Sequence, residues 1–211
     1  MTKELVLSVL ACVAIGYLIG CISPAFFAGK RRGYDVRETG SKNAGASNVL
    51  IMAGKFAGAI VALLDIFKAF GSWKLAEAIF PELPAAGMIA GASCVFGHMY
   101  PVFLGFRGGK GVSSGAMIAL VIDWRVFLCV LGAFFVAALL SKKVSLGSIC
   151  GALTIFIASL TFHVSVPRLV LAGVAMLLVV VRHRENILRI VRGTEPDFKP
   201  GKSLRRGKDE C

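Results

Sequence analysis

Charged residues are absent from two long stretches of this sequence, and acidic residues are scarce throughout. Residues 5–29 and 83–106 contain no Asp, Glu, Lys or Arg, and the whole chain has 12 acidic residues against 24 Lys and Arg. About 20 apolar residues cross the hydrocarbon core of a membrane as a helix, so both stretches are long enough. Hydrophobic residues make up 56% of the chain, and the mean hydropathy is +0.77. This composition excludes an ordinary soluble domain and predicts an integral membrane protein.

Other absences argue against a β-barrel, disulfides and metal sites. The apolar runs lack the two-residue alternation of membrane-spanning strands, so we expect an all-α fold. No two of the six cysteines form a C-x-x-C pair, and five lie in apolar runs, where cysteine behaves as a small hydrophobic residue. The His and acidic residues do not cluster at metal-ligand spacing. We therefore predict no disulfide framework, no metal site and no cofactor.

The apolar residues form seven segments, which predict a polytopic helix bundle. If every segment crosses the membrane, the bundle has seven transmembrane helices; if the fourth and fifth both fail to cross, five remain. The fourth and seventh are short enough to be partial spans. Glycine pairs four residues apart predict close packing between helices. The segments are 5–28, 53–79, 83–102, 111–122, 126–140, 144–162 and 169–181, and the pairs are Gly16/Gly20, Gly54/Gly58, Gly87/Gly91, Gly111/Gly115 and Gly147/Gly151.

Basic residues predict which ends of the helices face the cytoplasm. Lys and Arg concentrate after the first, third, fifth and seventh segments, and the intervening ends carry few. Cytoplasmic loops are enriched in Lys and Arg, so we expect the N-terminus outside and the C-terminus inside. Residues 1–195 are predicted to form one membrane-embedded domain, and residues 196–211 a basic tail that binds anionic lipids. That tail accounts for the net charge of +12 without a nucleic-acid partner.

Residues 40–48 form the first of three polar loops on the predicted cytoplasmic side. The loop reads G-S-K-N-A-G-A-S-N and then enters a helix. Its hydroxyls, amides and unhindered backbone N–H groups suit an anion at a helix N-terminus. We expect Ser41, Asn43 and Asn48 to bind substrate; a flexible loop with a helix cap is the plainer alternative.

Residues 97–114 form the second loop, in which glycines surround a lysine. Gly108, Gly109 and Gly111 let the backbone wrap an oxyanion while the ammonium of Lys110 neutralises it. The loop is not a Walker A motif, because the first glycine of that motif and the Ser or Thr after its lysine are missing. His98 begins the loop, and we expect it to support the substrate site.

Residues 182–189 form the third loop. If this segment is helical, His183 and Asn186 share one face, where the histidine can donate to a phosphate oxygen or shuttle a proton. Arg184 is a further candidate for binding phosphate. A basic helix lying on the lipid headgroups is the alternative.

The three loops resemble those of the bacterial acyl-phosphate–glycerol-3-phosphate acyltransferases, the PlsY-type membrane enzymes. The family loops look like G-S-G-N-x-G-A-T-N, G-H-x-x-P-V-F-x-x-F-x-G-G-K-G-V and H-R-x-N-I-x-R, and they correspond here to residues 40–48, 97–112 and 183–189. The resemblance covers nearly the whole chain. Three positions depart from it: Lys42 replaces a glycine, Ser47 replaces a threonine, and Ile51 replaces an arginine that is thought to grip phosphate.

The resemblance implies an early step of phospholipid synthesis. A fatty acyl group passes from acyl phosphate to the sn-1 hydroxyl of glycerol 3-phosphate, giving lysophosphatidate and phosphate. It implies a multi-pass monomer in the bacterial plasma membrane, with the active site facing the cytoplasm. The expected catalytic residues are Lys110, His183 and Asn186; the expected substrate-binding residues are Ser41, Asn43, Asn48, His98, Gly108, Gly109, Gly111 and Arg184.

Three other functions remain open. Because of Ile51, the chain is alternatively a non-catalytic or substrate-altered paralogue. A transporter or binding module would need polar residues deep in the spans; only Asp65 and Lys68 qualify, and their spacing predicts an ion pair on one helix face. A phosphatidyltransferase would need paired aspartates and a metal, and that pattern is missing.

Overall fold

The computed structural model describes residues 2–198 of the chain, and within that range every regular element is a helix. The first predicted segment is one long helix followed by a short one, and a short helix precedes the second segment. The elements are α1 (Lys3–Cys21), α2 (Pro24–Lys30), α3 (Ala46–Ala53), α4 (Lys55–Ile79), α5 (Ala86–Met99), η1 (Val102–Leu104), α6 (Val112–Ile122), α7 (Trp124–Ser141), α8 (Val144–Thr161), α9 (Val166–Arg182) and α10 (Arg184–Val191).

Each of the seven predicted apolar segments is helical, which confirms the all-α prediction. By length and composition, five helices or joined helices suit a membrane span, and a sixth is added if α9 and α10, which meet at 59°, count as one broken span. Helix α6 is apolar but only 11 residues long. Helix length and composition therefore support five or six crossings, and the predicted total of seven stays a prediction.

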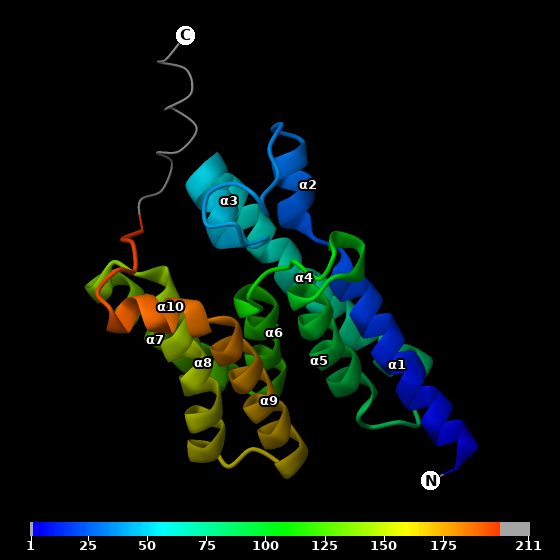
Figure 1. The fold of residues 1–211 in the computed structure, drawn as a ribbon. Coiled ribbons are helices and arrows are strands. Elements are labelled where there is room, and N and C mark those ends of the chain that lie inside the picture. The colour runs from blue at the N-terminus through cyan, green and yellow to red at the C-terminus, as the bar shows by residue number, and fades with distance from the viewer. Residues whose placement is uncertain (1, 199–211) are drawn as a thin grey trace.

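The helices form two groups on either side of α6 (Figure 1). Helices α1, α4 and α5 pack together, α7, α8 and α9 pack together, and α6 contacts members of both groups. The α1–α5 pair depends on two of the predicted glycine positions. A Cβ added to Gly16 would lie 2.1 Å from the carbonyl oxygen of Ala90, and one added to Gly20 would lie 2.2 Å from that of Cys94. Glycine is therefore required for these backbones to approach so closely.

Large apolar side chains cover the outside of the bundle. Helix α7 buries only Val126, while Leu139 and Leu140 are 75% and 82% exposed. In water such a surface would be unstable, but lipid tails accommodate it. The described chain is accordingly that of a multi-pass membrane protein.

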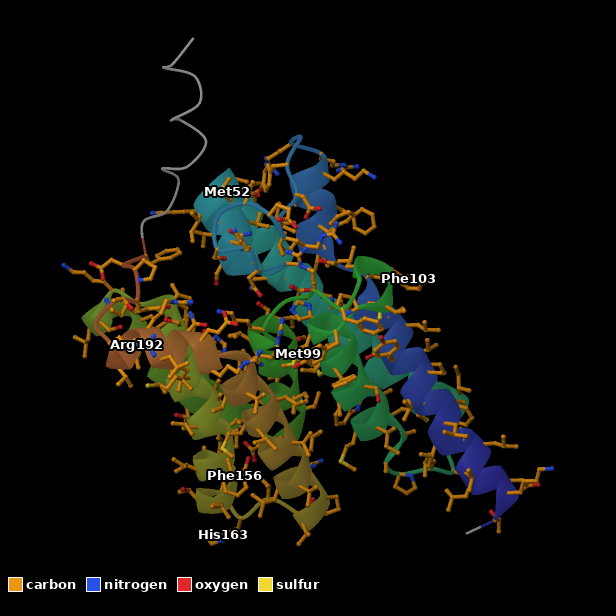
Figure 2. The ribbon with its side chains drawn as sticks, viewed as in Figure 1. Met52, Met99, Phe103, Phe156, His163 and Arg192 are labelled. Atoms are coloured by element: carbon orange, nitrogen blue, oxygen red, sulfur yellow. The ribbon has the colours of Figure 1, made fainter. Side chains whose placement is uncertain are left out.

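The basic connections gather at one end of the bundle. Helices α2, α3 and α10 lie there, with the α7–α8 turn and the loop before α6, whereas the N-terminus and the α4–α5 and α8–α9 turns lie at the other end (Figure 1). Met52 and Arg192 mark the first end, and His163 the second (Figure 2). All three polar loops therefore lie at the same end of the bundle, as the alternation of basic and less basic connections along the chain predicts. Of the predicted tail, residues 199–211 lie outside the described residues.

Candidate active site

Asn48 organises the loop between α2 and α3. Its side chain is fully buried; Nδ2 donates to the carbonyl oxygens of Val36 (2.8 Å) and Thr39 (3.0 Å), and Oδ1 accepts from the N–H of Ser41 (2.9 Å). The amide expected to bind substrate thus has three backbone partners. We conclude that it acts by holding the loop in shape, which leaves Ser41 and Asn43 as the side chains able to reach a ligand.

The α2–α3 loop meets the glycine loop at Gly45. A Cβ built on Gly45 would lie 2.9 Å from Asn43 Nδ2 and 3.9 Å from the Cα of Gly109. Arg107 joins the same two loops, because its guanidinium pairs with Glu38 at 2.8 Å. Two segments more than 60 residues apart in the chain therefore form one surface.

Close approach explains the glycines beside Lys110. The N–H of Gly109 donates to the carbonyl oxygen of His98 at 3.0 Å. A Cβ on Gly108 would lie 2.1 Å from that oxygen, and one on Gly109 would lie 2.0 Å from His98 Nε2. Gly111 has a φ of +77°, which L side chains rarely adopt. The loop is thus pressed against the end of α5, and any larger residue would displace it.

Arg182 holds the glycine loop from the opposite side and is absent from the expected site. It donates to the carbonyl oxygen of Gly109 from Nε (3.2 Å) and Nη2 (3.1 Å), and its guanidinium lies 4.9 Å from the ring centre of Tyr100. Nη2 also donates to the carbonyl oxygen of Gly108 at 3.4 Å, so two carbonyl groups of the loop point toward Arg182. The only sequence signal was its place beside His183 in a basic run.

Lys110 meets Asn186, as expected for two residues of one site. Its Nζ donates to Asn186 Oδ1, and Asn186 Nδ2 donates to Glu195 Oε1 at 2.7 Å. Glu195 is 8% exposed and also accepts from Ser145 (2.6 Å) and Arg189 (2.7 Å). The carboxylate thus fixes the orientation of the Asn186 amide, so that its oxygen faces the ammonium.

Glu195 and Ser145 were not predicted, because only the folded chain brings them to the site. Residues after α10 return along the α7–α8 turn, where Phe198 N donates to the carbonyl of Lys142 at 2.8 Å and Lys143 pairs with Asp197 at 2.7 Å. The predicted boundary at 195/196 therefore falls inside a docked segment.

Burial sets the charge properties of this network. Burial lowers the pKa of Lys110 to about 8, against the opposing attraction of Glu195. Burial alone would raise the pKa of Glu195, but hydrogen bonds from Ser145, Asn186 and Arg189 lower it. The site therefore contains an ammonium that is poorly hydrated and is stabilised by a nearby anion.

His183 lies at the bend between α9 and α10. It is 2% exposed, and its Nδ1 lies 2.8 Å from the carbonyl oxygen of Val179, so Nδ1 carries the hydrogen and donates. Nε2 is then the free ring nitrogen, since no hydrogen bond to it forms within residues 2–198. Burial lowers the pKa of His183 to about 4, and the positive charge of Lys110 acts in the same direction, so the imidazole is neutral near pH 7. Arg184, the next residue, is exposed.

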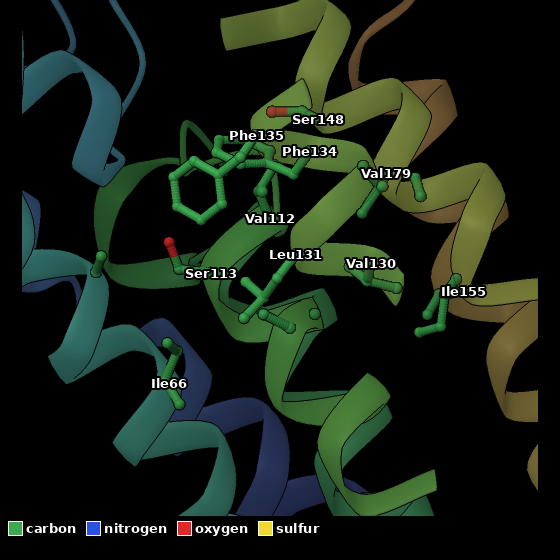
Figure 3. Close-up of a pocket in the computed structure, with 16 residues that line it drawn as sticks. Ile66, Val112, Ser113, Val130, Leu131, Phe134, Phe135, Ser148, Ile155 and Val179 are labelled. Carbon is green, nitrogen blue, oxygen red and sulfur yellow. The ribbon is translucent and has the colours of Figure 1, made fainter. Parts of the chain in front are cut away.

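An apolar cavity of about 310 Å³ adjoins the polar site (Figure 3). Its lining begins at Val112 and Ser113, directly after the glycine loop, and includes Val179, whose carbonyl holds His183. Phe134 and Phe135 of α7, Ile155 of α8 and Ile66 of α4 complete its walls (Figure 3). A cation and N–H donors next to such a cavity suit a ligand with a charged head and an apolar tail.

The remaining expected residues divide between this site and other places. His98 is buried under the glycine loop, and Ser41 is exposed on the α2–α3 loop. Ile51 is half-buried in α3, Lys55 is exposed, and Lys42 has a φ of 55°, a backbone conformation that favours the glycine of the family pattern. Among residues 2–198, no three His, Cys, Asp or Glu side chains are placed to hold a metal ion.

Sequence comparison finds many relatives with one description. Residues 10–193 match the family described as glycerol-3-phosphate acyltransferase. A glycerol-3-phosphate acyltransferase of Prochlorococcus marinus (strain NATL1A) is 42% identical over 86% of this chain and 93% of its own length. One from Staphylococcus saprophyticus is 38% identical over 88% of this chain and 95% of its own.

Solved structures agree with the sequence relatives. The crystal structure of PlsY (YgiH), an integral membrane glycerol 3-phosphate acyltransferase, in its glycerol 3-phosphate form has a TM-score of 0.84 and 34% identity, covering 95% of this chain and 99% of that one. The lysophosphatidic acid form gives 0.82 and 35%, covering 91% and 96%. The family match over residues 10–193, the same helical fold and this degree of identity lead to one conclusion: the chain belongs to the glycerol-3-phosphate acyltransferase family.

Proposed function

We propose that this protein transfers a fatty acyl group from acyl phosphate to the sn-1 hydroxyl of glycerol 3-phosphate, releasing lysophosphatidate and phosphate. One observation carries the proposal: the glycine loop with the Lys110–Asn186 pair adjoins an apolar cavity, whose lining begins at Val112 and Ser113. The PlsY structures with glycerol 3-phosphate and lysophosphatidic acid support the acceptor and the product.

The proposed orientation places this site at the cytoplasmic face of the bacterial plasma membrane. Helices α1 and α4 to α9 all cross, with α6 as a short crossing, the N-terminus lies outside and the C-terminus lies inside. The gathering of the basic connections at one end supports this orientation, because positive residues are retained in the cytoplasm. The exposed basic residues there face the anionic lipid surface, and one chain contains the whole site.

The polar end of the site offsets the charge of two phosphates. Each phosphate carries roughly −1.5 to −2 charge near neutral pH, so bringing two together requires cations and N–H donors. Lys110 lies between them, the backbone of Gly108 and Gly111 wraps one, and Arg184 lies at the entrance. Gly109 holds the loop in place, because its own N–H is bonded to the carbonyl oxygen of His98. Ser41 and Asn43 contribute from the facing loop. Asn48 and His98 hold the two loops in place.

The apolar cavity receives the acyl tail, which leaves the acyl carbonyl near Lys110. The hydroxyl oxygen of glycerol 3-phosphate attacks that carbonyl carbon, and the bond from carbon to the phosphate oxygen breaks. The hydroxyl proton passes to a phosphate oxygen of the bound substrates. His183 Nε2 aligns the hydroxyl, and Asn186 holds the Lys110 ammonium toward the leaving phosphate. Positioning and electrostatic stabilisation supply the acceleration.

A direct assay tests the proposal. Purified protein in lipid vesicles is given acyl phosphate and glycerol 3-phosphate, and lysophosphatidate and released phosphate are measured. Both products should form in equal amounts without nucleotide and in the presence of EDTA. Equal rates with acyl-CoA as the donor, or complete loss of activity in EDTA, would contradict the proposed donor and chemistry.

The second candidate is a paralogue with altered substrate or no activity. The half-buried Ile51 favours it, because an apolar side chain stands where the family pattern has an arginine that is thought to grip phosphate. Lys42 and Lys55, both exposed nearby, are the available compensating cations. Product formation from glycerol 3-phosphate at a normal rate would reject this candidate.

A further inference from the structure

Three ionisable side chains form a cluster inside the bundle, beneath the glycine loop. Lys68 Nζ lies 2.9 Å from Asp65 Oδ1, and His98 Nδ1 lies 3.2 Å from the same oxygen. Their side chains are only 8%, 1% and 3% exposed, respectively for Lys68, Asp65 and His98. The predicted ion pair is thus confirmed, with a histidine added from α5. Neither Asp65 nor Lys68 touches the Lys110–Asn186 network described above.

The ammonium of Lys68 links the cluster to the end of α1. Nζ donates to the carbonyl oxygens of Gly20 (3.1 Å) and Ile22 (2.7 Å), which the end of the helix leaves without helical partners. With His98 Nδ1 as the third acceptor, 3.0 Å away, all three ammonium protons are used. Because an ammonium can only donate, His98 Nδ1 is the acceptor, and Asp65 Oδ1 contacts both neighbours at ion-pair distance without accepting a hydrogen bond within residues 2–198. The hydrogen bond from Lys68 and the close contact with Asp65 together fix the orientation of the imidazole.

His98 in turn holds the glycine loop in place through a hydrogen bond and close packing. Its carbonyl accepts the N–H of Gly109 at 3.0 Å, and its Nε2 edge packs so closely on Gly109 that a Cβ there would lie 2.0 Å away. A rotation of the imidazole would push the loop outward. Arg182 therefore holds the carbonyl groups of Gly108 and Gly109, while the ring of His98 packs against Gly109.

A buried ion pair in an apolar setting is seldom kept for stability, because desolvation offsets most of its attraction. A well-packed apolar pair would hold α4 against α5 at least as well. What an apolar pair cannot do is hold the imidazole in one orientation through a hydrogen bond. The cluster is therefore better explained by orientation than by stability.

We propose that Asp65 and Lys68 are positioning residues: through His98 they hold the backbone of the Gly108–Gly109 loop in the conformation that receives the substrate phosphate. The inference rests on the proposed function, since phosphate is the ligand of that loop. Because Asp65 and Lys68 do not touch the reacting atoms in the proposed mechanism, we expect their loss to weaken substrate binding more than turnover.

The test compares two double variants on the same helix. Asp65→Asn/Lys68→Gln removes both buried charges together and leaves amide donors for the carbonyls of Gly20 and Ile22. The control is Lys74→Met/Glu77→Gln, which removes an exposed ion pair of the same spacing in α4 and keeps an acceptor for Trp73. Asp65→Glu, which retains both charges but displaces the carboxylate from His98, covers the case in which the first variant fails to fold.

The measurements are the Kd of glycerol 3-phosphate by calorimetry, KM and kcat, and amide hydrogen exchange of residues 105–111. We expect the buried double variant to raise Kd and KM between about 10- and 100-fold, with a much smaller change in kcat and with faster exchange in the loop. Asp65→Glu should give a smaller change of the same sign. The control should match the wild type.

Wild-type Kd and KM in a folded buried variant would overturn the inference, even with faster exchange, since the cluster would then be merely structural. An equal loss in the exposed control would also overturn it. A wild-type protein that binds glycerol 3-phosphate without acyl transfer would instead contradict the proposed reaction, and the comparison of Kd values would still decide the role of Asp65 and Lys68.

Discussion

Lys110 Nζ donates a hydrogen bond to the side-chain oxygen of Asn186, which lies 76 residues further along the chain. The contact joins the glycine loop to the bend between α9 and α10, and Glu195 fixes the amide from behind. A half-buried ammonium thus has a neutral partner, with its charge left available for an anion. Substrate phosphate completes this arrangement in the proposed mechanism.

Lys110→Met should be among the most damaging single substitutions. Loss of a charge-assisted contact costs about 1.5–3 kcal/mol, or roughly 10- to 150-fold in kcat/KM. Arg107→Met is the control, because Arg107 lies in the same loop but pairs with Glu38 at the surface, and its effect should be mild. Steady-state kinetics with both substrates make the comparison. Near-normal kcat/KM for a folded Lys110→Met protein would remove the basis of the phosphate site.

Activity should fall as the pH rises through about 8, where the pKa of Lys110 lies because burial lowers it from 10.5. Above that pH the site loses its ammonium, and kcat/KM for anionic substrates decreases. Unfolding would not explain the loss. The unfolded chain binds the extra proton between the two pKa values, so this group makes the folded state more stable as the pH rises through that window.

The pH profile and thermal melts, measured together from pH 6 to roughly 10, check this expectation. Lys110→Arg keeps its charge over the whole range and serves as the control, so its falling limb should move to higher pH. A wild-type profile that stays flat above pH 8 would contradict the role of the ammonium.

Ile51→Arg should lower the KM for glycerol 3-phosphate, because it restores a cation of the family pattern beside the α2–α3 loop. A new charge-assisted contact is worth about 1.5–3 kcal/mol when well placed. Ile51→Gln, a similar length without charge, is the control. KM is obtained for both variants from initial rates over a range of glycerol 3-phosphate concentrations. An unchanged or higher KM for the arginine variant would show that the phosphate binds elsewhere.

Filling the apolar cavity should change the preferred acyl chain. Ala152 of α8 lines the cavity and is 8% exposed, so Ala152→Phe occupies space that the proposed tail needs. The ratio of kcat/KM for long to short acyl phosphates should fall several-fold, on the scale of about 0.8 kcal/mol per buried methylene. Leu153→Phe lies one residue further on and is 43% exposed at the surface, so it should leave the ratio unchanged. Equal ratios in both variants would place the tail in the surrounding lipid.

Cysteine labelling should confirm the proposed orientation. An impermeant reagent added outside intact cells should reach a cysteine placed at Pro81 or Asp123, which lie at the ends of α4 and α6. It should not reach one at Lys42 or Lys142 until the membrane is opened. Labelling of the Lys42→Cys variant from outside would show that the proposed orientation is wrong.

The sequence was sufficient for the fold class and the location of the loops. Uncharged runs of this length have few alternatives to membrane helices, and local glycine, lysine and histidine patterns identified the loops that the structure brings together. The spacing of Asp65 and Lys68 also gave their ion pair correctly, because a helix fixes which residues share a face.

Tertiary structure decided what the expected residues do. The sequence alone made Asn48 a ligand-binding candidate, yet the folded loop uses its amide to hold its own backbone. Local pattern gave no role to Ser145 and Glu195 and only a place in a basic run to Arg182, because their partners lie on other helices or on the segment that returns after α10. Composition and periodicity determine how a chain enters a membrane, since those are local properties. Which polar groups meet depends on packing between distant helices, and only the folded structure supplies that.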